Sequence, residues 1–516
     1  MQHTPILVVG GSLVGLSTSL FLSWHGVAHI VIDKHPGSSP HPRALGFTET
    51  TLEHYRAVGI ADQIPQVPAG TRLRRVTVDS LAGEWKSEQA WTPGEAPVRP
   101  SEQSPCTGAA IAQDRLEPIL RAAAVKGGAD CRNSSELIDF QLEQDGVLAL
   151  VRDRHSGQQY EIGARYLIAA DGAASPIREK LGIPRSGVGH LGMLRSVLFH
   201  CPGADAVLQR GAQQFAIEQE GFRAFLTTYG DSRWVLMLDG DEDRTGAELQ
   251  SAIRRALGAD LAFAIITTGR WELAGRIADT YRHGPVFLAG DAAHQLPPTR
   301  GGFGANTGID DAWNLAWKLK RVLAGEAAPA LLDTYDAERQ PIGWLRHQQT
   351  FSRPDYATRA GAAFTPDPLF GNDALEFGQL VRSAAVAGAG PDLPAAAAPG
   401  QWRGQPGTRA PHVWLERTGR RMSSLDLFGK EYVLLSANQA WLAVAGELGL
   451  QPVAVGAGIV FPPTQPFGAL FGVAQEGASV VRPDGIIGWR SQDAPEDGSI
   501  GELAATLMRQ PERACP

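Results

Sequence analysis

The stretch PILVVGGSLVGLSTSLFL, residues 5–22, has the pattern of a strand, a glycine-rich turn and a helix. The run from Ile6 to Val9 is apolar and largely β-branched, which favours a buried strand. The next six residues, from Gly10, follow the spacing G-x-G-x-x-G with Ser12 in place of the second glycine. In a dinucleotide-binding turn these positions make a tight turn, admit a pyrophosphate and pack helix against strand. The hydroxyl of Ser12 is a candidate partner for a phosphate oxygen.

An acidic residue stands at the distance that such a turn requires. The apolar run AHIVID ends at Asp33, 23 positions after Gly10, where a carboxylate suits a ribose hydroxyl in a βαβ unit of about 30 residues. A plain strand-turn-helix explains the glycines alone, so Asp33 favours a dinucleotide ligand. The stretch GVGHLG at 187–192 has the same spacing. It follows no strand and opens no helix, and we predict a loop there.

A second glycine-rich loop, DAAHQLPPTRGGFGAN at residues 291–306, follows the apolar run VFLAG. Asp291 ends this strand, and we expect the next helix to begin near Asn306. The first N–H groups of that helix lack partners and suit an electron-rich carbonyl or ring nitrogen. Glycines at positions 301, 302 and 304 leave bare backbone for a flat ring. An ordinary helix start with turn residues is the alternative interpretation.

Bulk properties exclude several classes of function. A chain of 516 residues is too long for one hydrophobic core, so two or three domains are expected. A net charge of −8 gives no support for nucleic-acid or anionic-membrane partners. The four cysteines are far apart and form no C-x-x-C, which suits a reducing cytoplasm without structural zinc or disulfides. With no signal peptide and no run of about 20 apolar residues, we expect a cytoplasmic protein without metal.

Further motifs accompany the two loops: P-R-A at 42–44, A-D-G at 170–172, G-D-A-A-H at 290–294 and N-T-G-I-x-D-A at 306–312. With them the chain resembles the class A flavoprotein aromatic hydroxylases, FAD monooxygenases similar to p-hydroxybenzoate hydroxylase and phenol hydroxylase. The closest resemblance is to the polyketide hydroxylases of anthracycline- and angucycline-type rings. It implies an α/β fold, in which a Rossmann-type FAD-binding domain carries an inserted, mainly antiparallel β-sheet substrate domain and a C-terminal thioredoxin-like domain.

The resemblance also implies cofactor contacts. The first turn would wrap the FAD pyrophosphate, Asp33 and Lys34 would meet the AMP ribose, and Arg43 would reach the pyrophosphate and the mobile flavin. Gln113 would contact the ribityl chain and the Leu137 backbone the adenine. The full implied set is Gly10, Ser12, Leu13, Val14, Gly15, Asp33, Lys34, Arg43, Gln113, Leu137, Asp171, Asp291, Pro298, Gly302, Gly304, Ala305 and Asn306.

Within this set Asp171 would support both FAD and pyridine-nucleotide binding, and Asp291 would contact the ribityl and pyrophosphate region. The residues from Gly302 to Asn306 would lie under the isoalloxazine. For His294 we expect a structural role near the ring rather than a role as base, and no catalytic residue is assigned.

Domain boundaries follow from the changes in pattern. The expected FAD-binding domain is discontinuous, at 1–72, 107–184 and 277–360, and the substrate sheet comprises 73–106 and 185–276. Residues 361–399 are expected to form a helical segment and linker, and residues 400–516 a thioredoxin-like domain. Thioredoxin chemistry needs paired thiols, so this last domain is expected to be redox-inert. In LLDTYDAERQPIGWL at 331–345 we predict a packed, salt-bridged helix face.

The implied activity is hydroxylation of a phenolic or quinoid polycyclic aromatic through a flavin hydroperoxide, with O₂ and NADPH or NADH. The reductant would bind transiently, because no second strand-linked fingerprint occurs. The expected partners are the aromatic substrate and O₂, in a monomer or homodimer. A Baeyer–Villiger monooxygenase on the same scaffold is the main alternative, and a halogenase is disfavoured because W-x-W-x-I-P is absent. A non-catalytic FAD-binding redox sensor and an assembly module are the alternatives outside this class.

Overall fold

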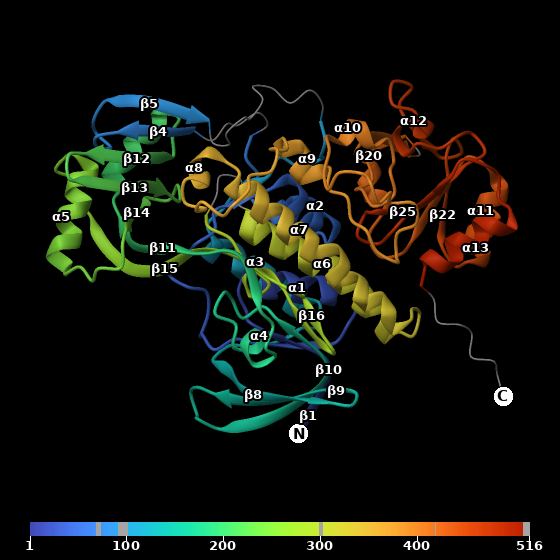
Figure 1. Ribbon diagram of the computed structural model, residues 1–516, viewed down its shortest axis with the longest axis horizontal. Helices are drawn as coiled ribbons and strands as arrows, with labels where there is room; N and C mark the ends of the chain where they lie inside the picture. Colours follow the sequence, from blue (N-terminus) through green and yellow to red (C-terminus); the bar gives the residue numbers. More distant parts are fainter. Residues whose placement is uncertain (69–73, 91–101, 299–302, 418, 509–516) are drawn as a thin grey trace.

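The computed structural model describes residues 1–516 except 69–73, 91–101, 299–302, 418 and 509–516. Its N-terminal strand lies inside an eight-stranded mixed sheet at the bottom and centre of Figure 1. Five strands run parallel in the order β17-β10-β1-β2-β7, while β16 and the β8–β9 hairpin join antiparallel. The strands are β1 (Gln2–Val9), β2 (His29–Ile32), β7 (Asp130–Arg132), β8 (Ser135–Glu143), β9 (Gly146–Asp153), β10 (Gln159–Ala169), β16 (Arg282–His283) and β17 (Val286–Leu288).

Helices cover this first sheet. The helix after the first turn, α1 (Leu13–Trp24), contacts both α3 (Gln113–Lys126) and α6 (Phe303–Leu323). The predicted strand-turn-helix is therefore confirmed, with Ile6, Leu7 and Val8 fully buried beneath it. On the other side of α6 lies α7 (Asp333–Phe351). Shorter helices complete the layer: α2 (Glu49–Ala57), α4 (Pro176–Lys180), α8 (Pro354–Ala357) and α9 (Asn372–Phe377).

A second eight-stranded sheet forms the left lobe of Figure 1, in the order β18-β15-β11-β14-β13-β12-β4-β5. All its neighbouring strands pair antiparallel except β4 and β12, which pair parallel. One face packs under α5 (Gly246–Leu257) around Val197, Phe215 and Leu236. The strands are β4 (Arg74–Val78), β5 (Trp85–Ala90), β11 (Arg185–His200), β12 (Gln214–Gln219), β13 (Phe222–Thr228), β14 (Arg233–Asp239), β15 (Ala264–Ala278) and β18 (His294–Gln295).

The loop predicted for GVGHLG at 187–192 is wrong, because these residues belong to β11. Their pairing with β15 shifts register between Ser186 and Gly189 and again between His190 and Gly192. Gly187 and Gly189 have φ of +126° and +81°, a backbone conformation that glycine adopts without strain. The bulges interrupt the apolar–polar alternation, so the strand is hidden in the sequence.

The C-terminal unit, at the right of Figure 1, contains a four-stranded sheet in the order β22-β21-β24-β25. A parallel β-α-β unit precedes an antiparallel hairpin and a closing helix. No cysteine lies between residues 400 and 508. The elements are β21 (Val433–Ser436), α11 (Gln439–Glu447), β22 (Gln451–Ala454), β24 (Ala478–Val481), β25 (Ile487–Ser491) and α13 (Asp497–Thr506). Beside them stand α10 (Pro399–Trp402), β19 (Trp414–Arg417), β20 (Arg420–Ser423), β23 (Ile459–Val460) and α12 (Phe467–Phe471).

A buried ion cluster fastens this unit to α6 and α7. The Glu338 carboxylate on α7 accepts from Lys318 Nζ at 2.9 Å and from both terminal nitrogens of Arg482 at 2.6 and 2.8 Å. All three side chains are fully buried. Although burial raises it, the charges of Arg482 and Lys318 hold the pKa of Glu338 well below its ordinary value. The salt-bridged face predicted for residues 331–345 is thus confirmed.

Neutralising Glu338 tests the importance of this cluster. We expect Glu338→Gln to destabilise the protein by about 3–5 kcal/mol, because two buried cations lose their shared partner. The matched control is Glu326→Gln, which removes one carboxylate from an exposed pair with Lys320. It should lower the free energy of unfolding by only about 0–1 kcal/mol. Urea unfolding of the two variants measures the difference. Equal shifts of the midpoint would contradict the argument.

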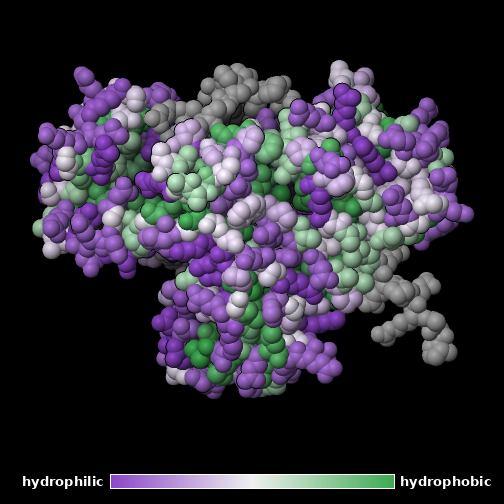
Figure 2. Space-filling view, viewed as in Figure 1, coloured by the Kyte–Doolittle hydropathy of each residue, from purple (hydrophilic) through white to green (hydrophobic). Residues whose placement is uncertain are grey.

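Within the described residues, no group of three or more His, Cys, Asp or Glu side chains is placed to hold a metal ion. In that same part of the chain, no helix is both long and apolar enough to cross a bilayer. On the face drawn in Figure 2, hydrophilic side chains predominate and hydrophobic ones form separate patches. An apolar surface that could meet a ligand lines a cavity between the two large sheets.

Candidate functional site

One continuous cavity of about 1950 Å³ joins the two large sheets. It begins at the first glycine-rich turn, passes the end of β10 and reaches the uncovered face of the second sheet. Pockets for drug-sized ligands occupy about 300–1,000 Å³. The cavity therefore has room for a dinucleotide together with a second organic molecule.

The first turn is built on close backbone contacts. A Cβ added at Gly10 would lie 2.2 Å from the carbonyl oxygen of Ala170, and one at Gly15 would lie 1.7 Å from that of Gly10. Gly11 N donates to Asp33 Oδ2 at 2.5 Å. The N-terminus of α1 is aimed at the cavity behind this turn, and no acidic side chain lies in its first turn. Free N–H groups at a helix N-terminus bind anions, so the turn fits a pyrophosphate.

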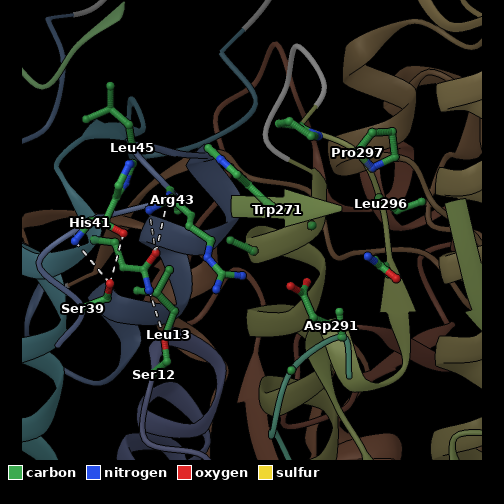
Figure 3. Close-up of a pocket in the computed structure, with 18 of the residues that line it drawn as sticks. Ser12, Leu13, Ser39, His41, Arg43, Leu45, Trp271, Asp291, Leu296 and Pro297 are labelled. Atoms are coloured by element: carbon green, nitrogen blue, oxygen red, sulfur yellow. Dashed lines mark hydrogen bonds between the residues drawn. The ribbon is translucent and has the colours of Figure 1, made fainter. Parts of the chain in front are cut away.

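The Ser12 hydroxyl forms its hydrogen bonds with side chains of the protein. It donates to Glu117 Oε1 at 2.6 Å and accepts from Gln113 Nε2 at 2.9 Å. The amide oxygen of Gln113 in turn accepts from the backbone N–H groups of Arg43 and Ala44 at 3.2 and 3.3 Å (Figure 3). In this arrangement the proton of Ser12 is directed to Glu117, and a bond from Ser12 to a phosphate oxygen stays a prediction. Glu117 is almost fully buried, and its burial was not predictable from the sequence because a glutamate on a helix usually faces solvent.

Two carboxylates line the cavity next to the turn. One oxygen of Asp171, Oδ1, is buried and has no hydrogen-bond partner among the described residues, and burial raises the pKa of this group. Asp291 faces the guanidinium of Arg43 across the cavity (Figure 3). Burial raises the pKa of Asp291, while His294 and Arg43 oppose the rise. A buried acceptor without a donor suits a polyhydroxylated chain, so these residues fit the ribityl and ribose portions of FAD.

His294 lies behind this wall and is fully buried. Its Nε2 is 2.7 Å from Asp311 Oδ2, and Arg339 Nε donates to the other oxygen of Asp311 at 2.7 Å. A Cβ at Gly308 would lie 2.8 Å from Gly290 Cα, so α6 packs directly on the loop that follows β17. This geometry supports the structural role expected for His294.

Most of the residues implied by the resemblance meet at the cavity. Those that line it are Gly10, Ser12, Leu13, Val14, Asp33, Lys34, Arg43, Gln113, Leu137, Asp171, Asp291, Pro298, Gly304 and Ala305. Gly15 lies behind the turn, and Gly302 is outside the described residues. Asn306 accepts from Thr48 N and Thr51 Oγ1. The helix expected to begin near Asn306 begins earlier, because α6 already includes Phe303. Gly304 is tolerated in its first turn.

The uncovered face of the second sheet supplies an apolar wall that sequence reasoning missed. Leu194, Phe225, Met237 and Trp271 line the cavity from four neighbouring strands, β11, β13, β14 and β15. Pro297 stands across from Trp271 (Figure 3). Alternation along the strands shows which residues share a face. It does not show which face meets a ligand.

Comparisons with known proteins agree with this site. Residues 3–350 match the family described as FAD binding domain, and residues 403–511 match aromatic-ring hydroxylase, C-terminal. Over 554 residues the chain is 37% identical to tetracenomycin A2 monooxygenase-dioxygenase of Streptomyces glaucescens, with 98% and 97% of the two chains covered. Identity is also 37% over 541 residues to 4-methyl-5-nitrocatechol 5-monooxygenase of a Burkholderia species, covering 98% of each. The structure of aklavinone-11 hydroxylase with FAD and aklavinone matches with a TM-score of 0.87 and 33% identity, covering 99% and 100%.

The fold and the cavity, read with these matches, define a flavoprotein aromatic monooxygenase with FAD as its cofactor. The chain belongs to the FAD-dependent aromatic-ring hydroxylases, and polyketide hydroxylases are among its relatives. The family expected from the sequence motifs is thereby confirmed, as is the mixed α/β fold.

The close contact at Gly15 gives a direct test of the turn. We expect Gly15→Ala to lower FAD retention at least about tenfold, because overpacking of this kind costs about 1–3 kcal/mol and displaces the turn. Gly446→Ala in α11 is the matched control, since nothing lies within 4 Å of its added Cβ. The absorbance of flavin per chain after gel filtration measures retention. Full retention in Gly15→Ala would show that the turn does not hold the cofactor.

Proposed function

We propose that the protein hydroxylates a fused phenolic or quinoid aromatic ring of polyketide type, using NAD(P)H and O₂. The observation that carries the proposal is the single cavity, in which the FAD turn and the apolar wall of Leu194, Phe225, Met237 and Trp271 are continuous. A flat wall of this kind suits a flat polycyclic ring. The relatives named for tetracenomycin and aklavinone chemistry support the same substrate class.

In this proposal FAD supplies the redox and oxygen chemistry, and the chain supplies binding and orientation. The N-terminus of α1 holds the pyrophosphate. Each oxygen of Asp33 already accepts one backbone N–H, from Gly11 and His35, and keeps a lone pair for the AMP ribose beside Lys34. The backbone of Leu137, at a bulge of β8, meets the adenine. Asp291 and Asp171 accept from hydroxyl groups nearer the flavin ring.

The substrate end of the cavity has a different task. Its apolar wall would exclude water from the reacting centre, and Arg43 extends its guanidinium into the cavity toward Asp291 (Figure 3). Pro298, Gly304 and Ala305 line the cavity and would lie against the isoalloxazine. No titratable side chain of the apolar wall is assigned as a base.

We also infer that residues 400–516 form a thioredoxin-like domain without redox function. The β-α-β unit, the hairpin and the final helix support this inference, as does the absence of C-x-x-C from the sequence. The ion cluster around Glu338 gives the domain a packing role. The domain limits 1–72, 107–184 and 277–360 for FAD, and 73–106 and 185–276 for substrate, belong to the same proposal.

Isotope labelling tests the reaction. With labelled dioxygen, NAD(P)H and a panel of polycyclic phenols, we expect one labelled oxygen atom in a hydroxylated product, detected by mass spectrometry. The control omits NAD(P)H. A labelled lactone or ester would favour a Baeyer–Villiger reaction instead. Loss of two electrons without label would point to a dehydrogenase, and NAD(P)H oxidation that gave only peroxide on every ring would reject the proposed substrate class.

Arg43 tests the assignment near the flavin. We expect Arg43→Ala to lower turnover about 10- to 100-fold with little loss of FAD, because a hydrogen bond to a charged group is worth about 1.5–3 kcal/mol. The turn and Asp291 still hold the dinucleotide in this variant. Arg165→Ala, an exposed site on β10, controls for the loss of one positive charge. Unchanged steady-state kinetics in Arg43→Ala would sink the assignment.

A further inference from the structure

The segment of residues 39–45 connects the two halves of the cavity. It follows β2 and carries Arg43 into the space between the FAD turn and the apolar wall (Figure 3). On the FAD side, Gln113 holds this segment through the backbone N–H groups of Arg43 and Ala44. The same Gln113 bonds Ser12 in the first turn. One end of the 39–45 segment is therefore fixed to the cofactor side.

The other attachment is to the substrate sheet. His41 Nε2 lies 2.9 Å from Ser196 Oγ on β11, and Trp271 Nε1 on β15 donates to the same oxygen at 3.0 Å. An indole N–H can only donate, so Ser196 accepts from Trp271 and shares a second hydrogen bond with His41 Nε2. Burial lowers the pKa of His41, which favours the neutral imidazole in this bond. Tyr229 adds a bond from its hydroxyl to the carbonyl of Pro42 at 2.6 Å.

The sheet is shaped to receive the imidazole. A Cβ at Gly269 on β15 would lie 2.7 Å from Ser196 Oγ and 3.2 Å from His41 Nε2. Gly269 pairs directly with Ser196 across the two strands. Bare backbone at this one position makes room for His41 against the sheet. Ser196 is itself 3% exposed, so the junction is protected from competing water.

We propose that His41 is a positioning residue of the monooxygenase: through Ser196 it holds the 39–45 segment, and with it Arg43, against the Trp271 side of the substrate pocket. Trp271 lines the cavity with its ring and bonds Ser196 with its N–H. A ring bound against Trp271 is thus linked to the FAD turn through Ser196, His41 and Gln113. This inference deepens the proposed hydroxylase function and rests on it.

The first test needs no substrate. In the FAD-loaded protein, hydrogen–deuterium exchange of the 39–45 amides should be about tenfold faster in His41→Ala and in Ser196→Ala than in wild type, because each removes the sheet attachment. Ser186→Ala is the matched control, since Ser186 lies on the same strand and bonds Asp279 away from the cavity. Unchanged exchange in both His41→Ala and Ser196→Ala would overturn the proposal.

The second test measures turnover, with 1,8-dihydroxyanthraquinone as the aromatic probe. Ser196→Ala should lower kcat for NAD(P)H oxidation about tenfold at unchanged FAD content, and should add little in an Arg43→Ala background, since residues in one network are not additive. A simple folding defect would instead lower the FAD content, and its effect on kcat would multiply with the effect of Arg43→Ala. Either result contradicts the inference. If wild type shows no probe-stimulated oxidation, the proposed function fails, while the exchange experiment still decides the role of His41.

Discussion

The site depends on a contact between two stretches of backbone. Gly10 and Gly15 allow the turn after β1 to touch its own carbonyl groups and the end of β10, and no side chain fits at either position. Asp33 then fixes the turn from the neighbouring strand through Gly11 N. Because this contact sets the direction of α1, it also places α3 and α6, which pack on α1 and carry Gln113 and Gly304.

Buried charge holds the distant parts of the chain in place around that contact. Asp311 joins His294 to Arg339, and Glu338 joins Lys318 to Arg482 from the C-terminal unit. Each carboxylate binds more than two partners at once, since Glu338 also accepts from Asn314 and Ser383, and Asp311 from Gly290 N. Charges removed from water tolerate little displacement, so these clusters fix the position of α7.

Local spacing made the cofactor half of the site predictable. The spacing of Gly10, Gly15 and Asp33 along the chain is enough to predict a dinucleotide-binding turn. The spacing of Asp291 and the glycines that follow it is informative in the same way. The substrate half was not predictable in this way. Ser196 and His41 are separated by 155 residues and meet only because β11 lies beside the 39–45 segment. Bulges hid the start of β11, and the burial of Glu117 depends on helix packing that no periodicity in the sequence reports.

The two faces of the second sheet have separate roles. Side chains such as Val197, Phe215 and Leu236 form a core with α5, while Phe225 and Met237 on the opposite face line the cavity. Exchange of a cavity-facing side chain leaves the core beneath it intact. Substitutions that adapt the cavity to substrate rings of another size or shape can therefore accumulate on one face at little cost in folding stability. This separation of the two faces gives the fold a physical route to new substrates.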